Sequence, residues 1–431
     1  MAPRSFVRAG ARVLLPATEP DAMPAPLFSR ALASRNYRLY FAGQLVSLAG
    51  TWMQQIAMVW LAYRLSNSAL VLGTVGFASQ VPILVLGPLT GVWTDRYDRR
   101  RILVVTQSLA MLQATALAIL AWGQWASPAA LVALAFGMGC INALDVPARQ
   151  AFVSQLIDDR EDLPNAIALN ALLMNATRFV GPALAGFAVA TIGEAWCFVL
   201  NAASYLAVLL ALLAIDAKPN PRQTAPVLEA FREALAYIRS RRDIRACLLL
   251  VGVVSFLVTP YAVMMPLFAR EIFGGDARTY GLLIASAGGG SLAAALYLAS
   301  RQGTGGLFRL VSVTAAAAGT ALACFALNGR LGLAFPIAAA IGFSVILTVA
   351  GSNTYIQTRV GDRQRGRVMA VFSMAFLGIA PLGSLAVGSL AHALGVRPIL
   401  VFCGLATAAA ALLAGRRMAG LEGRPADEED R

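Results

Sequence analysis

Charged side chains are scarce in this chain. Of its 431 residues, 13% are charged and 58% are hydrophobic, whereas soluble domains usually carry about 25% charged residues. The chain therefore has too little polar surface to face water on every side, which argues against a soluble globular protein. Lysine is nearly absent as well, with Lys218 as the single example, so arginine supplies almost all of the positive charge.

Histidine is also scarce, and closely spaced cysteines are missing. His392 is the only histidine, and we expect it to be an ordinary interfacial residue. No two cysteines have the spacing of a metal motif, and all lie in hydrophobic stretches: Cys140, Cys197, Cys247, Cys324 and Cys403. We therefore expect no metal and no cofactor. A membrane enzyme would need His, Asp, Glu or Cys clustered at hydrophobic depth, so the chain is not predicted to be an enzyme.

Long apolar runs are what the sequence does contain. A bilayer core about 30 Å thick requires roughly 20 apolar residues per helix. Twelve stretches meet this need, near residues 39–63, 69–93, 102–123, 128–148, 166–192, 196–215, 246–269, 279–300, 310–327, 331–358, 368–394 and 398–415. The predicted fold class is an all-α integral membrane protein with 12 transmembrane helices in two pseudo-symmetric six-helix bundles.

The basic residues alternate with these spans. With both termini in the cytoplasm, most of the 35 basic residues fall in cytoplasmic segments, and Arg178 alone lies inside a span. Positive loops remain in the cytoplasm because they resist translocation and favour anionic lipid. This placement explains the pI of about 10.2 without a nucleic-acid partner.

The chain is expected to divide into two halves around one long loop. The predicted parts are an N-terminal tail (1–35), a first bundle (36–215), a linker with an amphipathic helix (216–245), a second bundle (246–417) and a C-terminal tail (418–431). A weak repeat supports the division, since Gly181-Pro182 matches Ala380-Pro381. Transporters are often built from two such halves, with substrate bound between them.

The sharpest local motif lies after the second span. Gly91 and Asp95 begin a run that continues with Arg96, Arg99 and Arg100. Glycine permits close helix approach, and the arginines can pair with carboxylates or lipid phosphates. An ordinary positive loop is the simpler alternative.

This G-x-x-x-D-R-x-x-R-R run resembles the loop signature of the major facilitator superfamily. Further segments resemble its branch of enterobactin exporters and related efflux proteins: Asn36-Tyr37-Arg38, Gly50-Thr51-Trp52, Asn142 to Gln150, Asn165-Ala166 and Arg178 to Pro182. The resemblance covers residues 35 to 417. It implies a cytoplasmic latch in which Asp95 faces the eleventh helix near Arg367, while Arg96 or Arg99 pairs with Asp145. The second half has no acidic residue in its equivalent loop, so one latch is expected.

Three ionisable residues lie within spans or at their edges: Asp145, Arg149 and Arg178. A charge at the bilayer centre costs about 2.5–3.5 kcal/mol on insertion scales, so such groups face protein or a water-filled cavity. Asp145 and Arg149 are four residues apart and can pair on one helix face. Either the three form a structural ion-pair cluster, or Asp145 takes up a proton during a transport cycle.

The remaining candidates concern helix shape and the solute path. Gly181, Pro182 and Gly186 resemble the fifth-span motif of proton-exchanging exporters, and Pro381 is the second-half counterpart of Pro182. The resemblance places the cavity between spans one, four, seven and ten, which offer polar, aromatic and Met side chains. These cavity candidates are Gln44, Trp52, Gln55, Met138, Asn142, Tyr261, Asn353, Tyr355 and Gln357.

The sequence thus predicts a secondary active transporter that exports a small organic molecule, siderophore-like or drug-like, by alternating access. The missing G-x-x-x-x-G-K-[ST] motif disfavours direct drive by ATP. Expected partners are membrane lipid, the solute and protons, and the chain is expected to act as a monomer in the bacterial inner membrane. A metabolite importer and a non-transporting receptor of the same fold remain alternatives.

Overall fold

The computed structural model describes residues 30–157, 159–215, 227–301, 303 and 305–418. The described residues form helices joined by short turns and contain no strand. Within these residues, eleven helical segments are long and apolar enough to cross a membrane, and the longest of them is broken into two. The prediction of twelve spans is therefore confirmed.

The first half contains the short α1 (Arg30–Ala33) and five longer helices. These are α2 (Arg35–Ser66), α3 (Ala69–Arg96), α4 (Arg99–Trp122), α5 (Pro128–Phe152) and α6 (Leu163–Ala214). Gly193 divides α6 into the fifth and sixth spans, with φ of 82° and ψ of 167°. Asp98 caps α4 by accepting a hydrogen bond from the Arg101 backbone N–H at 3.1 Å.

Gly193 needs a positive φ, which an L-residue with a side chain rarely adopts. Replacing Gly193 with alanine is expected to destabilise the fold by about 1–2 kcal/mol through backbone strain alone, because the added Cβ would meet no atom within 4 Å. Thermal unfolding in detergent measures the effect. Gly137→Ala is the control, since Gly137 also has open space around it but lies in regular helix α5. Equal stability of the two variants would contradict the explanation.

The second half begins after the linker helix α7 (Val227–Ser240), which lies in the segment where an amphipathic helix is expected. The seventh span comprises α8 (Arg242–Val253), a π-helical turn, α9 (Tyr261–Leu267) and a second π-helical turn that ends at Ile272. The others are α10 (Ala277–Ser300), α11 (Leu307–Leu327), α12 (Leu331–Arg359), α13 (Asp362–Ser373) continuing through a π-helical turn into α14 (Ile379–Leu394), and α15 (Val396–Met418).

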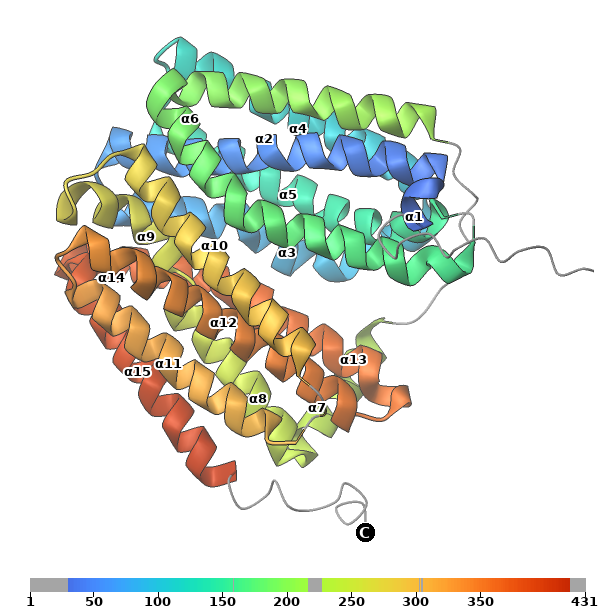
Figure 1. Cartoon of the computed structure of the whole chain (residues 1–431), viewed down its shortest axis with the longest axis vertical. Helices are drawn as coiled ribbons and strands as arrows, with labels where there is room; N and C mark the ends of the chain where they lie inside the picture. The colour runs from blue at the N-terminus through green and yellow to red at the C-terminus, as the bar shows by residue number, and fades with distance from the viewer. Residues whose placement is uncertain (1–29, 158, 216–226, 302, 304, 419–431) are drawn as a thin grey trace, which may run out of the picture.

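The two halves lie side by side and their helix axes diverge toward the end that carries α1, α7 and α13 (Figure 1). We call this the termini end, and the opposite one the far end. At the far end two glycine seams join the halves. In one, a Cβ added to Gly73 of α3 would lie 2.9 Å from the Gly388 Cα of α14. In the other, a Cβ added to Gly186 of α6 would lie 2.7 Å from the Gly281 Cα of α10.

Polar and aromatic contacts reinforce this far-end closure. The Tyr63 hydroxyl donates to the Glu271 carboxylate at 3.2 Å, and Ser68 lies 3.4 Å from the Nδ1 atom of His392. Trp60 stacks on Tyr280 with ring centroids 6.2 Å apart. All three contacts join the first half to the second, so the far end is held by hydrogen bonds and ring packing as well as by close backbone approach.

Candidate functional site

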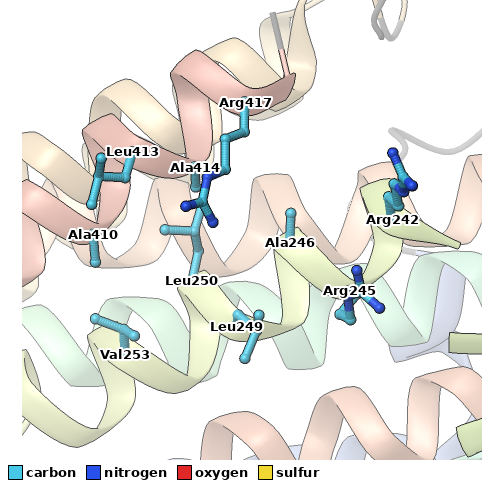
Figure 2. A pocket seen from close by; sticks show the side chains of 10 residues that line it. All are labelled: Arg242, Arg245, Ala246, Leu249, Leu250, Val253, Ala410, Leu413, Ala414 and Arg417. Atoms are coloured by element: carbon cyan, nitrogen blue, oxygen red, sulfur yellow. The ribbon is translucent and has the colours of Figure 1, made fainter. Parts of the chain in front are cut away.

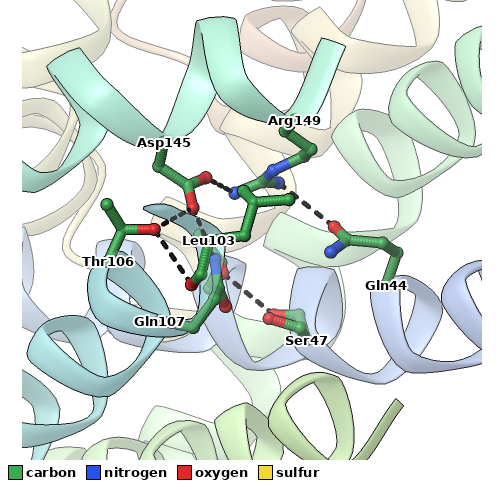
Figure 3. A network of polar contacts seen from close by, with 8 residues as sticks. Gln44, Ser47, Leu103, Thr106, Gln107, Asp145 and Arg149 are labelled. Carbon is green, nitrogen blue, oxygen red and sulfur yellow. Dashed lines mark hydrogen bonds and ion pairs between the residues drawn. The ribbon is translucent and has the colours of Figure 1, made fainter. Parts of the chain in front are cut away.

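A buried polar network surrounds Asp145 on α5 (Figure 3). Only 1% of Asp145 is exposed, and its carboxylate accepts hydrogen bonds from Thr106 and Gln107 of α4, each at 2.8 Å. Arg149, one turn further along α5, forms an ion pair with the other carboxylate oxygen. Arg149 also donates to the Gln44 side chain of α2 at 3.2 Å. The network therefore ties three helices of the first half to one carboxylate.

Several polar atoms beside this network lack a partner. Within the described residues, the Tyr40 hydroxyl, Gln107 Oε1 and Arg149 Nε are buried and make no hydrogen bond. Each unsatisfied buried group costs about 1–3 kcal/mol. In a network built only for stability these atoms would form hydrogen bonds. Their free bonding capacity allows the side chains of this network to exchange hydrogen-bond partners.

Arg178 lies near the middle of the fifth span, 15 residues from each end of the Leu163–Gly193 segment. Its side chain is exposed, and within the described structure it makes no ion pair or hydrogen bond. Because a helix turns by about 100° per residue, Arg178 lies opposite the exposed apolar stripe of Val180, Leu184 and Phe187. The side chain therefore points away from lipid.

Neighbouring contacts define the direction in which Arg178 points. A Cβ on Gly181 would lie 2.5 Å from Trp52 of α2, while Gly186 faces α10. Around the axis of α6, Gly181 lies about 60° to one side of Arg178 and Gly186 about 80° to the other. Arg178 thus projects between the directions of α2, the first span, and α10, the eighth span, at the boundary of the two bundles.

The proline and glycine candidates of α6 lie at this same boundary between the bundles. Pro182 has no N–H, so the carbonyl of Arg178 lacks its usual helical donor. That oxygen would lie 2.4 Å from a Cβ on Gly288 of α10, so only glycine permits the approach. Backbone through Pro182 stays helical, and α6 breaks at Gly193 instead. In the second half, Pro381 follows the π-helical turn Met374–Gly378.

The motif residues at the end of α3 show a different pattern from the expected latch. Arg99 donates to the Ala151 carbonyl oxygen at 3.1 Å, and Arg100 donates to the Leu212 and Leu213 carbonyl oxygens at 2.6 and 2.8 Å. Arg96 is exposed. Arg367 pairs with Glu233 of α7. The side chains of Gly91 and Asp95 lie outside the described residues. Asp145 is thus occupied by Arg149 rather than by an arginine of this motif.

The nine cavity candidates differ in exposure. Gln44, Tyr261 and Tyr355 are buried, and the rest are half-buried or exposed: Trp52, Gln55, Met138, Asn142, Asn353 and Gln357. Trp52 packs against Gly181, and Gln357 donates to Asn353 one turn away. Met138 contacts the small apolar cluster around Tyr205. Gln44 therefore contacts Arg149, and Trp52 packs on α6 one turn from Arg178, whereas Tyr261 belongs to the packed core.

Sequence reasoning missed Asp243 and did not identify the partners of Gln54. Asp243 of α8 is buried, pairs with Arg241 at 3.2 Å and accepts a hydrogen bond from Tyr355 at 3.3 Å. In the first half, Gln54 bonds to Gln113 and Asn201, each at 2.8 Å. Amides in apolar spans were the available signal for the partners of Gln54. Asp243 lies beside several arginines in the segment assigned to the linker (216–245), so the sequence gives no signal that it is buried.

Twelve spans in two bundles, with a buried polar network inside the first bundle, are the architecture of a polytopic membrane transporter of the major facilitator fold. The model of the transmembrane secretion effector family matches residues 28–428. The chain therefore belongs to this family, and its relatives are major facilitator transporters rather than enzymes. The predicted family, fold class and transport role are confirmed.

Relatives match along nearly their whole length. The staphyloferrin A transporter of Staphylococcus aureus is 25% identical over 375 residues, which cover 86% of this chain and 93% of that protein. The multidrug efflux pump Tap of Mycobacterium tuberculosis is 26% identical over 395 residues, which cover 86% of this chain and 91% of that protein. A solved bacterial homolog of the human lysosomal transporter Spinster has a TM-score of 0.66 at 15% identity and covers 90% of this chain and 98% of that one.

Proposed function

We propose that this transporter exports small organic molecules that carry an acidic group, in exchange for protons. The observation that carries the proposal is Arg178, an exposed guanidinium at mid-span that points between the two bundles. An arginine at this depth must face water or a ligand. Its planar donors suit a carboxylate or phosphate of the solute. Relatives named for a siderophore and for drugs support a solute of this size class.

The proton is proposed to act at Asp145. When this carboxylate takes up a proton, its charge-assisted pair with Arg149 is lost, and the polar network acquires a second arrangement. Coupling requires an element with two arrangements whose relative populations depend on both the proton and the solute. Arg149 contacts Gln44 of α2, so the change is transmitted to a helix that also packs against α6 near Arg178.

We further propose that both termini are cytoplasmic and that the chain acts as a monomer. The excess of arginine at the termini end supports this orientation. The glycine seams then close the outer side, and the helix axes of the two halves diverge toward the cytoplasm (Figure 1). An exporter collects its solute from the cytoplasm, in a state that is open on that side.

Replacing Arg178 with glutamine tests the proposal. Loss of one charge-assisted hydrogen-bonded contact of about 1.5–3 kcal/mol is expected to reduce efflux of acidic solutes by about 10- to 100-fold. Efflux of cationic drugs should change little. Accumulation assays in a host that lacks its own exporters measure both, and everted vesicles given a proton gradient establish the direction. Arg178→Lys should retain part of the activity because it keeps the charge.

An exposed arginine outside the solute path provides the matched control. Arg397 at the far end donates to the Asn328 carbonyl oxygen and faces solvent. Arg397→Gln is expected to leave efflux unchanged. Equal loss for acidic and cationic solutes in Arg178→Gln would assign Arg178 a structural role and overturn the proposed substrate class.

A further inference from the structure

A groove outside the transport path lies between α8 and α15 at the termini end. It has a volume of about 600 Å³ and an apolar floor, and three arginines stand along it. The floor and rim residues are Arg242, Arg245, Ala246, Leu249, Leu250, Val253, Ala410, Leu413, Ala414 and Arg417. Figure 2 shows Arg417 extending from α15 toward α8, over the aliphatic side chains.

The three arginines are available to a ligand. Each is exposed, and within the described residues none of them forms an ion pair. Arg245 donates only to the Arg239 carbonyl oxygen, at 3.3 Å. Three guanidinium groups on one groove repel one another, so their arrangement favours an anion that several can share.

The groove extends from the level of the lipid headgroups to the level of the acyl chains, which is further than a free anion requires. Arg242 begins α8, and Val253 lies 11 residues further along it, which is about 16 Å deeper in the membrane. Leu249 and Leu413 at intermediate depth are 64% and 55% exposed, so they face the acyl chains of the bilayer. Positive charge at headgroup level above apolar surface at acyl level matches the two parts of one phospholipid molecule.

A second groove lies on the other side of α15. Its volume is about 420 Å³, and Arg309 of α11 and Arg416 of α15 line it together with Ser312. The Ser312 hydroxyl is buried and makes no hydrogen bond to the described residues. Because Arg416 and Arg417 are consecutive, α15 presents one arginine to each groove. The termini end of α15 therefore has a basic groove on each of two sides.

We propose that the α8–α15 groove binds the headgroup of an anionic phospholipid, with Arg242, Arg245 and Arg417 around its phosphate and the acyl chains over Leu249 and Val253. Basic pockets between spans at a membrane surface are suited to such headgroups. The bound lipid ties the first and last spans of the second half together at the end where the bundles diverge. This site is independent of the solute and of the direction of transport.

The full-length transporter in detergent, mixed with dioleoylphosphatidylglycerol or dioleoylphosphatidylcholine, tests the proposal by native mass spectrometry. We expect the anionic lipid to bind in preference to the zwitterionic one. Combined Arg242→Gln, Arg245→Gln and Arg417→Gln substitutions are expected to lower its affinity by at least about tenfold, because each basic residue near the headgroup contributes. These side chains are exposed, so the substitutions leave the core intact.

Two controls separate a built site from general surface charge. Arg270→Gln, Arg330→Gln and Arg397→Gln remove the same charge at the far end and should leave affinity unchanged. Ala246→Phe fills the floor of the groove while keeping all three arginines, and it should weaken binding as the charge removal does. Unchanged affinity in Ala246→Phe, or equal losses in both triple variants, would overturn the proposal.

The C-terminal tail offers a competing occupant. Residues 419–431 include five carboxylates, Glu422, Asp427, Glu428, Glu429 and Asp430, directly after Arg417 in the chain. If the tail occupies the groove, only a variant that ends at Met418 will prefer the anionic lipid. That result would overturn the proposal in favour of the tail, whereas equal preference in the full chain and the shortened variant would support it.

Discussion

Replacing Gly186 with valine is expected to abolish most transport by preventing closure of the far end. A Cβ at this position would lie 2.6 Å from the Ala277 carbonyl oxygen and 2.7 Å from the Gly281 Cα. Overpacking of this kind costs about 1–3 kcal/mol. Because the clash exists only when the seam is closed, the cost shifts the balance toward the far-end-open state by about 5- to 150-fold.

Transport assays combined with spin-label distances measure this effect. Labels at Asn67 and Gly329 report the separation of the two halves at the far end, on a background in which the native cysteines are replaced. We expect a longer distance and slower transport in Gly186→Val. Gly137→Val is the matched control, since a Cβ on Gly137 meets no atom within 4 Å. Normal transport by Gly186→Val, with an unchanged distance, would remove the seam from the mechanism.

Asp145→Asn is expected to eliminate proton-driven transport and also to destabilise the protein. The substitution leaves the charge of Arg149 without its partner in a buried site, and breaking such a pair costs about 3–5 kcal/mol. Thr106 and Gln107 can still bond to the amide oxygen, so part of the network remains. Thermal unfolding and proton-driven efflux, measured on the same preparation, give the two effects separately.

A double variant distinguishes coupling from stability. Asp145→Asn with Arg149→Gln removes both charges, so most of the lost stability should return. If Asp145 carries the proton, transport stays absent in this stable protein. Recovery of proton-driven transport would show that the pair is structural. The Arg64–Glu194 pair, 3.1 Å apart and with Arg64 exposed, is the control, because neutralising it should cost at most about 1 kcal/mol.

The spans were predictable because membrane insertion depends on local composition. A run of about 20 apolar residues crosses the bilayer wherever it occurs in a chain. Even the turn at Asn328, Gly329 and Arg330 was identified correctly, and α11 ends at Leu327 while α12 begins at Leu331. The break in α6 was expected between residues 192 and 196, and it lies at Gly193. Gly395 adopts a similar φ of 90° between α14 and α15, a correspondence between the halves that the sequence repeat did not reveal.

The partners of the charged residues could not be predicted in the same way. Asp145 was assigned both to a latch arginine and to Arg149, and the structure pairs it with Arg149. The choice depends on how far α3 and α5 are rotated about their axes, which composition does not specify. Similarly, the 38 glycines include the four of the far-end seams, but nothing in their local sequence marks Gly73, Gly186, Gly281 and Gly388 as mutual neighbours.

The sequence by itself therefore determined the class of protein, the number of spans and the division into halves. These properties follow from the polarity of each segment, which decides whether it lies in lipid or in water. Only the tertiary structure decided that Arg178 points between the bundles, that Asp243 is buried and that the arginines of α8 and α15 share a groove. These features arise from packing between segments that are distant in the chain, and each depends on the rotation and tilt of two helices at once.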